Sequence, residues 1–304
     1  MQFVKMHGAG NDFVLLDLFS AASTRPDEEW IALAQSMCDR HFGVGSDGLL
    51  LVLPSEVADA RMRMFNPDGS ESASCGNGIR CLGRFLYDRY GIGADALTVE
   101  TGAGISGISV HENGTVTVDM GAPIFVPADI PTAVNGRDAL DVALTIDGEP
   151  LAVSCVSMGN PHAVTFVRSG ELEGYPLETI GPKVEHHELF PQRTNFEVCE
   201  VLDERSMRVR VWERGAGITL ACGTGACASA VVATTLGRVR PPVNVELPGG
   251  VLSIDWHEGG SVMMTGPTAY VFAGAWSDST PRSSESAAVA AHAEAETQPV
   301  GSAR

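Results

Sequence analysis

Two cysteines stand in the same local sequence, each followed by Gly-x-Gly and then by residues typical of a helix: Cys75-Gly-Asn-Gly78 and Cys222-Gly-Thr-Gly225. A thiol at the start of a helix faces unpaired backbone N–H groups and the positive end of the helix dipole, which favour the thiolate. The same N–H groups can hold a carboxylate, and glycines let it approach the backbone. A lone cysteine of this kind is more often a small buried residue, but a matched pair favours a functional interpretation.

Two such thiols suit the inversion of a stereocentre. One group removes a proton from one face of the carbon while the other delivers a proton to the opposite face, so one must be thiolate while the other is thiol. Helix N-termini that converge on a substrate carboxylate would stabilise the carbanion. The remaining cysteines stand in apolar patterns or alone, and we expect them to pack in the core: Cys38, Cys81, Cys155, Cys199 and Cys227.

An internal repeat places the two cysteines at equivalent positions. The shift of 147 residues that aligns them also aligns residues 61–65 with 208–212, two segments that alternate like half-exposed strands. A shift of 149 sets Asn11 against Asn160, each preceded by glycine. The ordered chain therefore consists of two halves with the same strand, turn, cysteine and helix pattern.

The repeat predicts one central helix in each half. The first carries apolar residues on one face and ends near Gly91, and the second, residues 226–236, is apolar on all sides, as in a buried helix. Strand-like runs surround the helices at residues 49–53, 97–100, 115–119, 151–156, 163–167, 196–201, 243–247 and 262–265. We expect an α+β fold of two pseudo-symmetric lobes, each a mixed or antiparallel sheet wrapped around its central helix.

Proline- and glycine-rich segments at 121–123 and 127–131 are the best candidates for a linker between the halves. We expect an N-terminal lobe of residues 1–121 with 266–276, and a C-terminal lobe of residues 122–265. The last stretch, 277–304, has almost no large apolar residue, and its composition predicts a disordered tail.

Composition and charge exclude several classes of function. The chain has 304 residues, 44% of them hydrophobic, and a formal net charge of −18, which argues against binding to nucleic acid or an anionic membrane. No apolar run approaches the length of a membrane helix, and the start of the chain lacks the apolar region of a signal peptide. We therefore expect a cytoplasmic protein, and seven cysteines, an odd number, fit reduced thiols there.

The chain offers little for a cofactor or a metal. It contains only two lysines, Lys5 and Lys183, and neither lies in a glycine- and serine-rich phosphate loop, which lowers the odds of pyridoxal phosphate. It has no Cys-x-x-Cys pair, and Cys75 and Cys222 lie too far from the cysteines that follow them for a usual zinc knuckle. We expect neither a cofactor nor a metal.

Seven sequence blocks in order resemble the diaminopimelate epimerase family, and the resemblance covers residues 5 to about 274. The blocks are His7-Gly-Ala-Gly-Asn-Asp-Phe13, Phe65-Asn-Pro-Asp-Gly-Ser70, Cys75-Gly-Asn-Gly78, Gly159-Asn-Pro-His162, Arg193-Thr-Asn195, Glu213-Arg-Gly215 and Ala221-Cys-Gly-Thr-Gly225. The resemblance implies cofactor-independent interconversion of LL- and meso-diaminopimelate in lysine and cell-wall precursor synthesis. It also implies two pseudo-symmetric lobes, closure on the substrate and a homodimer.

The resemblance assigns roles to residues in these blocks. Cys75 and Cys222 would be the catalytic thiols, and His162 and Glu213 would adjust the pKa values of the thiols. The substrate contacts would be Asn11, Asn66, Gly76, Asn77, Asn160, Asn195, Glu213, Arg214, Gly223 and Thr224. Taken singly, an asparagine more often serves a turn, His162 could cap a strand, and Glu213 and Arg214 could be a solvated pair.

The repeat makes the two halves chemically unequal, because only the second supplies a Glu–Arg pair. An arginine can hold a carboxylate with two hydrogen bonds while a glutamate accepts from an ammonium group, so Glu213 and Arg214 would suit an amino-acid zwitterion. Two positions depart from the family pattern: Gly48 stands where the family often has Gln, and Phe272 stands where a tyrosine often supports the dimer.

Three other functions stay open from the sequence. A two-cysteine racemase of the same fold, acting on proline or hydroxyproline, is the nearest alternative. A metal or thiol-redox protein would use the cysteines and the eight histidines, but their spacing disfavours it. A non-catalytic binding module would leave the two helix-start thiols without a purpose.

Overall fold

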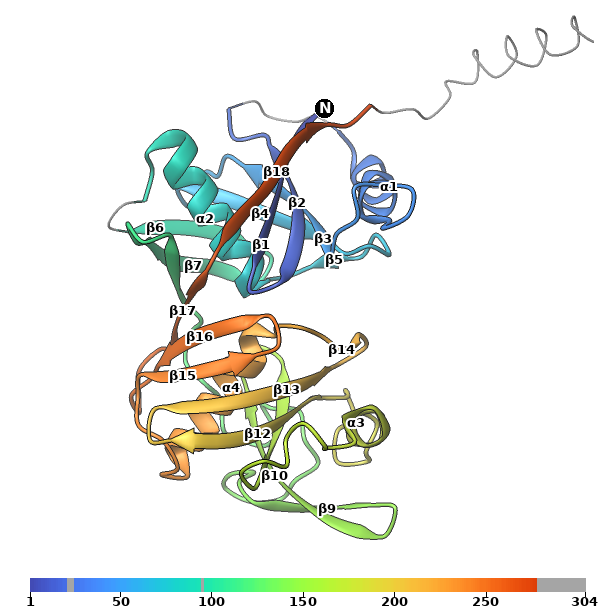
Figure 1. The fold of residues 1–304 in the computed structure, drawn as a ribbon, viewed down its shortest axis with the longest axis vertical. Coiled ribbons are helices and arrows are strands. Elements are labelled where there is room, and N and C mark those ends of the chain that lie inside the picture. Colours follow the sequence, from blue (N-terminus) through green and yellow to red (C-terminus); the bar gives the residue numbers. More distant parts are fainter. Residues whose placement is uncertain (21–24, 94–95, 278–304) are drawn as a thin grey trace, which may run out of the picture.

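The computed structural model describes residues 1–20, 25–93 and 96–277. Two lobes lie one above the other, and each contains a helix enclosed by strands (Figure 1). Apart from Ser277, the stretch 277–304 predicted as a disordered tail lies outside the described residues. The expected α+β class is confirmed, since strands dominate and helices are few.

The strand pairing of the first half repeats in the second. In the N-terminal lobe, β1 is antiparallel to β2, β2 is parallel to β3, β3 is antiparallel to β4, and β4 is parallel to β6. These strands are β1 (Gln2–Gly8), β2 (Asn11–Asp17), β3 (Gly48–Leu53), β4 (Ala60–Phe65) and β6 (Leu97–Thr101).

The second lobe has the same alternation of antiparallel and parallel pairs along β10, β11, β12, β13 and β15. Their bounds are β10 (Glu149–Ser157), β11 (Pro161–Val167), β12 (Asn195–Asp203), β13 (Ser206–Glu213) and β15 (Val243–Leu247). The aligned segments 61–65 and 208–212 fall on β4 and β13. The sequence repeat is therefore a repeat of topology.

Further strands complete the sheets. The consecutive antiparallel strands β6, β7 and β8 correspond to β15, β16 and β17. Strand β5 pairs with β4, and β14 pairs with β13. Strand β9 pairs with β10, and β18 pairs with β1. Their bounds are β5 (Glu71–Ser72), β7 (Gly104–Val110), β8 (Thr115–Asp119), β9 (Val142–Ile146), β14 (Gly217–Ile218), β16 (Gly250–Asp255), β17 (Met263–Pro267) and β18 (Ala269–Ala275).

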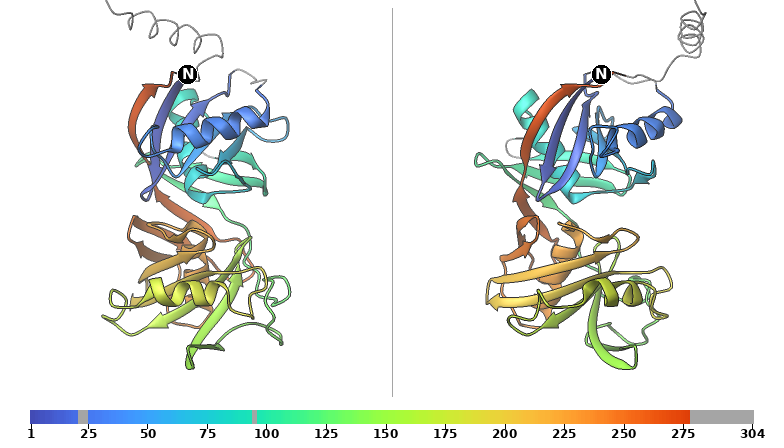
Figure 2. Two further views of the ribbon diagram at one scale, coloured as in Figure 1. Left: turned by 90° about the vertical axis from the view of Figure 1, so that its right-hand side faces the viewer. Right: turned by 45° about the vertical axis from the view of Figure 1, so that its right-hand side comes forward.

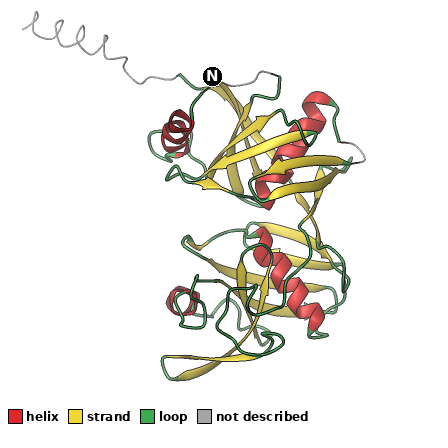
Figure 3. Cartoon of the chain, turned by 180° about the vertical axis from the view of Figure 1, so that it is seen from behind, coloured by secondary structure: helices red, strands yellow, loops and turns green. Residues whose placement is uncertain are grey.

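The central helices are α2 (Gly76–Tyr90) and α4 (Gly223–Thr235). Figure 3 shows each of them inside the strands of its own lobe. Helix α2 ends at Gly91, whose left-handed backbone (φ 68°) forms the predicted end of the helix. Helix α4 is buried all round because its residues are small and apolar. It begins before the expected residue 226, since Cys222 already caps it.

Two outer helices were not predicted, α1 (Asp27–Cys38) and α3 (Leu177–Glu185). Helix α1 covers the outer face of β3 and buries Trp30 and Met37 in a separate apolar cluster. Figure 2 shows it on the outside of the first lobe. Helix α3 carries an internal Pro182, a residue that normally interrupts a helix. The formation of both helices therefore depends more on tertiary packing than on the local sequence pattern.

One apolar cluster contains residues of both lobes. Strand β17 pairs with β16 on one side and with β8 on the other, so the sheet passes from one lobe to the other. Met264 of β17 lies against the starts of both central helices: a Cβ at Gly76 would lie 2.8 Å from its Cε, and one at Gly223 would lie 3.2 Å from its Sδ. The glycines that follow the two cysteines thus both pack closely on one side chain, which a larger residue would displace.

All seven cysteines are free. The five expected in the core are buried, which confirms their packing role: Cys38, Cys81, Cys155, Cys199 and Cys227. No helix in the described ranges is long and apolar enough to cross a membrane.

The position of α2 in its lobe depends on close contact at Gly83, because a Cβ there would lie 2.4 Å from Cδ1 of Ile108. We expect Gly83→Ala to lower the free energy of unfolding by about 1–3 kcal/mol through overpacking. Ile108→Val removes Cδ1, so the double variant should lose less stability than the two single losses combined. Chemical denaturation of the three variants measures this, and additive losses would contradict it.

Candidate active site

Cys75 and Cys222 are the N-cap residues of α2 and α4. The Sγ of Cys75 accepts a hydrogen bond from the N–H of Gly78 at 3.4 Å, and the Sγ of Cys222 accepts one from the N–H of Gly225 at 3.3 Å. Both cysteines have extended backbones, which turn the side chain back over the first turn of the helix. The structure thus places both thiols as the sequence predicts.

Both cysteines line one cleft of about 1790 Å³. Every predicted substrate contact also lines it: Asn11, Asn66, Gly76, Asn77, Asn160, Asn195, Glu213, Arg214, Gly223 and Thr224. They come from both of the lobes seen in Figure 1, so the cleft that they line lies between the lobes. His162 is absent from the lining and is fully buried.

In the first lobe the amides of Asn11 and Asn77 form a connected pair beside Cys75. The Nδ2 of Asn77 donates to the Oδ1 of Asn11 at 3.1 Å and to the backbone carbonyl of Ala221 at 3.1 Å. The thiol of Cys75 lies 3.9 Å from the Oδ1 of Asn11. Arg80, fully buried, donates to the Oδ1 of Asn77 at 2.7 Å. Asn77 therefore links the two helix starts, because Ala221 directly precedes Cys222.

In the second lobe a buried chain leads from Glu197 to Cys222. The Oε1 of Glu197 lies 2.7 Å from the Nδ1 of His162, and the Nε2 of His162 lies 3.0 Å from the Oδ1 of Asn160. The Nδ2 of Asn160 donates to the hydroxyl of Thr224 at 3.4 Å, and that hydroxyl lies 3.5 Å from the Sγ of Cys222. His162 thus contacts the site through Asn160 and Thr224.

Within the described residues, the side chains of Glu213 and Arg214 are bonded to other groups and not to each other. The Glu213 carboxyl accepts a hydrogen bond from the Thr219 hydroxyl and interacts with Cys222. The Arg214 guanidinium is directed elsewhere and donates to the carbonyl of Gln192 at 3.3 Å, while the Arg214 N–H donates to the Oδ1 of Asn195 at 2.9 Å. The two neighbours therefore present a carboxyl beside the thiol and a cation at the cleft.

Burial raises the pKa of both thiols, and the charges around them differ. At Cys75, the loss of solvent is opposed by the N–H of Gly78, while Glu213 adds to the rise in pKa. At Cys222, the loss of solvent together with Glu213 and Glu197 raises the pKa well above its ordinary value. Burial also raises the pKa of Glu213, which the hydrogen bond from Thr219 opposes. At both thiols burial therefore outweighs the lowering of the pKa by the helix start, which corrects the expectation from the sequence that the helix start favours the thiolate.

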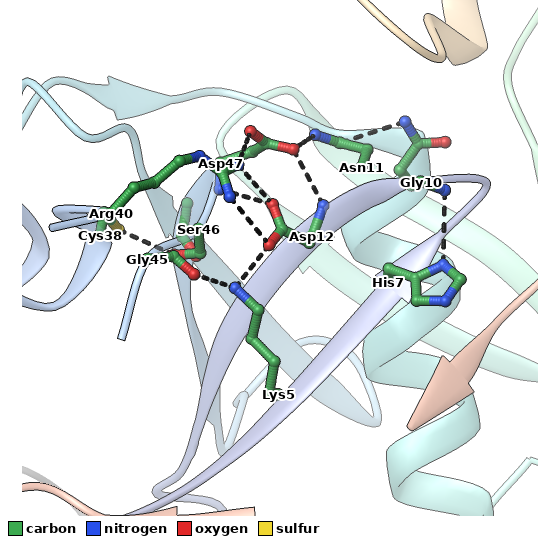
Figure 4. A network of polar contacts seen from close by, with 12 residues as sticks. Lys5, His7, Gly10, Asn11, Asp12, Cys38, Arg40, Gly45, Ser46 and Asp47 are labelled. Carbon is green, nitrogen blue, oxygen red and sulfur yellow. Dashed lines mark hydrogen bonds and ion pairs between the residues drawn. The ribbon is translucent and has the colours of Figure 1, made fainter. Parts of the chain in front are cut away.

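A charged network beside Asn11 was not predicted. The Oδ2 of Asp47 accepts from the Nδ2 of Asn11 at 2.9 Å and from the N–H of Asp12 at 3.0 Å. Arg40 bridges Asp12 and Asp47 at 2.9 and 2.7 Å, and the buried Lys5 pairs with Asp12 at 2.6 Å (Figure 4). The sequence gives a signal only at the glycine-rich segment 43–48, and the partners lie up to 42 residues apart in the chain.

Gly48, the departure from the family pattern, lies outside the cleft lining. A Cβ at this position would lie 2.8 Å from Cε of Met64 and 3.1 Å from the carbonyl of Phe65. Packing against β4 therefore explains a glycine here, and Asp47, one residue earlier, lines the cleft.

Glu197 was also not predicted. It lies in β12 with no exposed surface, and its Oε1 would be 2.9 Å from a Cβ at Gly225, in the first turn of α4. Its position in an apolar strand is the only sequence signal, since a carboxyl is rarely placed there without a partner.

Comparison with known proteins points to the same family that the sequence blocks resemble. The family model for diaminopimelate epimerase matches residues 3–126 and 154–271. A diaminopimelate epimerase of Desulfitobacterium hafniense is 50% identical over 279 residues, covering 90% of this chain and 97% of that protein. One of Acetivibrio thermocellus is 48% identical over 279 residues, with 90% and 98% coverage.

A solved structure shares the fold at low identity. A probable proline racemase of Agrobacterium radiobacter matches with a TM-score of 0.65 and 13% identity, covering 93% of this chain and 94% of that one. The fold is thus common to enzymes with different substrates, whereas the family model and the curated relatives separate this chain from them. The chain belongs to the diaminopimelate epimerase family.

Proposed function

We propose that this protein is an isomerase that interconverts LL- and meso-diaminopimelate without a cofactor, in lysine and peptidoglycan precursor synthesis. The observation that carries the proposal is the pair of thiols, Cys75 and Cys222, each capping a central helix at the edge of one cleft. One thiolate removes the α-proton while the other thiol delivers a proton to the opposite face. The choice of diaminopimelate as the substrate rests on the curated relatives, which are diaminopimelate epimerases.

The helix starts supply the electrostatic part of the proposed mechanism. Gly76 and Gly223, the first residues of the two helices, both line the cleft. Two helix N-termini on one carboxylate would stabilise the negative charge that develops when the α-proton leaves. Asn77, bonded to the carbonyl of Ala221, holds the two starts together.

Arg214 is the proposed anchor for a substrate carboxylate. Within the described part of the cleft wall, the other long basic side chains, Lys5 and Arg40, are neutralised by Asp12 and Asp47. The Arg214 guanidinium instead meets only the carbonyl of Gln192 among the hydrogen bonds of the described residues. A cation without a carboxylate partner is available to bind one from a ligand.

Glu213 and His162 are proposed to adjust the pKa values of the two catalytic thiols. Glu213 interacts with Cys222 directly, and His162 acts through Asn160 and Thr224. The remaining asparagines, Asn66 and Asn195, are proposed as polar contacts of the substrate.

The proposal includes two lobes that close on the substrate, divided as residues 1–121 with 266–276 and residues 122–265. It is supported by β8, which ends at Asp119, and by β17, which pairs with a strand of each lobe. Exposed apolar side chains line the cleft, and closure would bury them: Ile105, Ile124, Ile218 and Leu220.

A homodimer in the cytoplasm is part of the same proposal. The exposed apolar side chains of β18 support it, since Tyr270, Val271 and Phe272 are each about half exposed. The seven free thiols fit a reducing compartment.

A proline or hydroxyproline racemase is the alternative, since a probable proline racemase shares the fold. The free guanidinium of Arg214 favours a substrate with a second charged end. Turnover assays with diaminopimelate, proline and hydroxyproline separate the two functions.

Replacement of either thiol should abolish epimerisation, because each face of the substrate needs its own proton carrier. For Cys75→Ala and Cys222→Ala we expect kcat to fall by at least about 10²–10⁴-fold. Exchange of the substrate α-proton in heavy water, measured for each isomer without added cofactor, is the readout. Cys155→Ala, a change at a buried cysteine of the second lobe, is the control. Turnover near that of the unmodified protein in either active-site variant would refute the two-thiol mechanism.

Removal of the proposed carboxylate anchor should weaken substrate binding. We expect Arg214→Ala to raise KM and to lower kcat/KM by about 10- to 100-fold, the loss of one charged hydrogen-bonded contact. Steady-state kinetics with diaminopimelate measures it, and Arg240→Ala, an exposed arginine paired with Glu204, is the control. A change in kcat with KM unaltered would contradict the anchoring role.

Loss of the carboxyl beside Cys222 should make that thiol easier to ionise. Because Glu213 raises the pKa of Cys222, Glu213→Gln should lower this pKa, so that alkylation of Cys222 accelerates at lower pH. The rate of iodoacetamide modification of Cys222 against pH, measured in a Cys75→Ala background, gives the midpoint. An unchanged or higher midpoint would show that Glu213 does not act on this thiol.

A further inference from the structure

The matched asparagines of the two lobes are held in opposite orientations. Asn11 turns its Nδ2 to Asp47, at 2.9 Å, and its Oδ1 towards Asn77 and Cys75. Asn160 instead turns its Oδ1 to the Nε2 of His162, at 3.0 Å, and its Nδ2 to Thr224. The repeat thus presents an amide oxygen on the Cys75 side and an amide N–H on the Cys222 side.

The orientation of Asn11 is decided by Asp47. An ionised carboxylate can only accept hydrogen bonds, and Arg40 on one oxygen and the N–H of Asp12 on the other keep Asp47 in place. The group of Asn11 that faces Asp47 must therefore be its NH₂ (Figure 4). Its carbonyl oxygen is left to face the other way.

The other end of this chain is decided by Arg80. A guanidinium can only donate, so the Oδ1 of Asn77 faces Arg80 and the Nδ2 of Asn77 faces Asn11. The hydrogen bonds run in one direction, from Arg80 through Asn77 and Asn11 to Asp47. Cys75 meets this chain at the Oδ1 of Asn11, which can accept its S–H at 3.9 Å.

We propose that Asp47 is a positioning residue that turns the amide oxygen of Asn11 towards Cys75 and so favours the protonated thiol there. The inference rests on the proposed function of Cys75 as a proton carrier. It adds a residue without direct contact with the thiol, and it explains why the carboxylate is bound in a network beside the cleft.

The other charged groups around these side chains are known from the structure. Cys75 faces Arg80 of its own helix and Glu213 of β13. Asp47 faces Arg40 and Asp12, and Lys5 of β1 lies behind Asp12. A test must therefore separate the orientation of Asn11 from a general effect of charge.

Two substitutions of Asp47 make this separation. Asp47→Ala removes both the charge and the acceptor that holds Asn11. Asp47→Asn removes the charge but keeps an oxygen for the Nδ2 of Asn11, because the same oxygen also accepts from the N–H of Asp12. The measurement is the pH midpoint of Cys75 alkylation by iodoacetamide, with the adduct identified by mass spectrometry in a Cys222→Ala background.

We expect Asp47→Ala to lower the midpoint by about half a pH unit or more, and Asp47→Asn to lower it much less. In an Asn11→Ala background, Asp47→Ala should have little effect. Asp119→Asn, which removes another carboxylate from the cleft wall, is the control for charge. Should Asp47→Ala fail to fold, Asn11→Ala alone must lower the midpoint by a similar amount.

Equal shifts in Asp47→Ala and Asp47→Asn, or the same shift with and without Asn11, would overturn the proposal in favour of a simple charge effect. No shift in any variant would also overturn it. Alkylation needs no substrate, so these outcomes are distinct from a failure of the proposed epimerase activity, which turnover assays on the unmodified protein report.

Discussion

The close approach of two helix starts over one methionine is the constraint on which the site depends. Gly76 and Gly223 both lie against Met264, where a Cβ would lie 2.8 Å from its Cε and 3.2 Å from its Sδ, so a larger residue at either position would displace that side chain. Strand β17 carries Met264 and pairs with strands of both lobes. The strand that connects the lobes is therefore also the strand on which the starts of the two central helices meet. This arrangement by itself brings both capping cysteines to a common cleft.

The backbone repeats while the polar side chains do not. At equivalent positions of the 147-residue repeat, Asn66 meets Glu213 and Leu50 meets Glu197, so the carboxyls beside a thiol belong to the second lobe only. Two identical environments would give two thiols of the same protonation preference, whereas a two-base reaction needs one thiolate and one thiol. Symmetry of the fold thus supplies the geometry, and asymmetry of the side chains supplies the difference in proton affinity.

The sequence predicted the parts of this arrangement that are local. Cys75 and Cys222 are recognisable because capping depends on the next three residues, and strand alternation is visible over five. The network of Lys5, Asp12, Arg40 and Asp47 was not predictable, since its members meet only when β1, β2 and the loop before β3 pack together. The acidic first turn of α1 is a sequence signal for the start of a helix. The sequence does not show, however, that the apolar face of this helix packs against β3.

Net charge is a poor guide to the site. A formal charge of −18 exerts little net force on a doubly zwitterionic substrate, whose two ammonium and two carboxylate charges cancel, and the field of distant charges is screened beyond roughly 8–10 Å at physiological salt. Within that distance the local pairing decides: Asp12 and Asp47 are neutralised by Lys5 and Arg40, and Arg214 retains its charge for a ligand. An acidic protein can therefore bind a doubly zwitterionic substrate, because Asp12 and Asp47 at the cleft are already paired with cations and Arg214 has no carboxylate partner among the described residues.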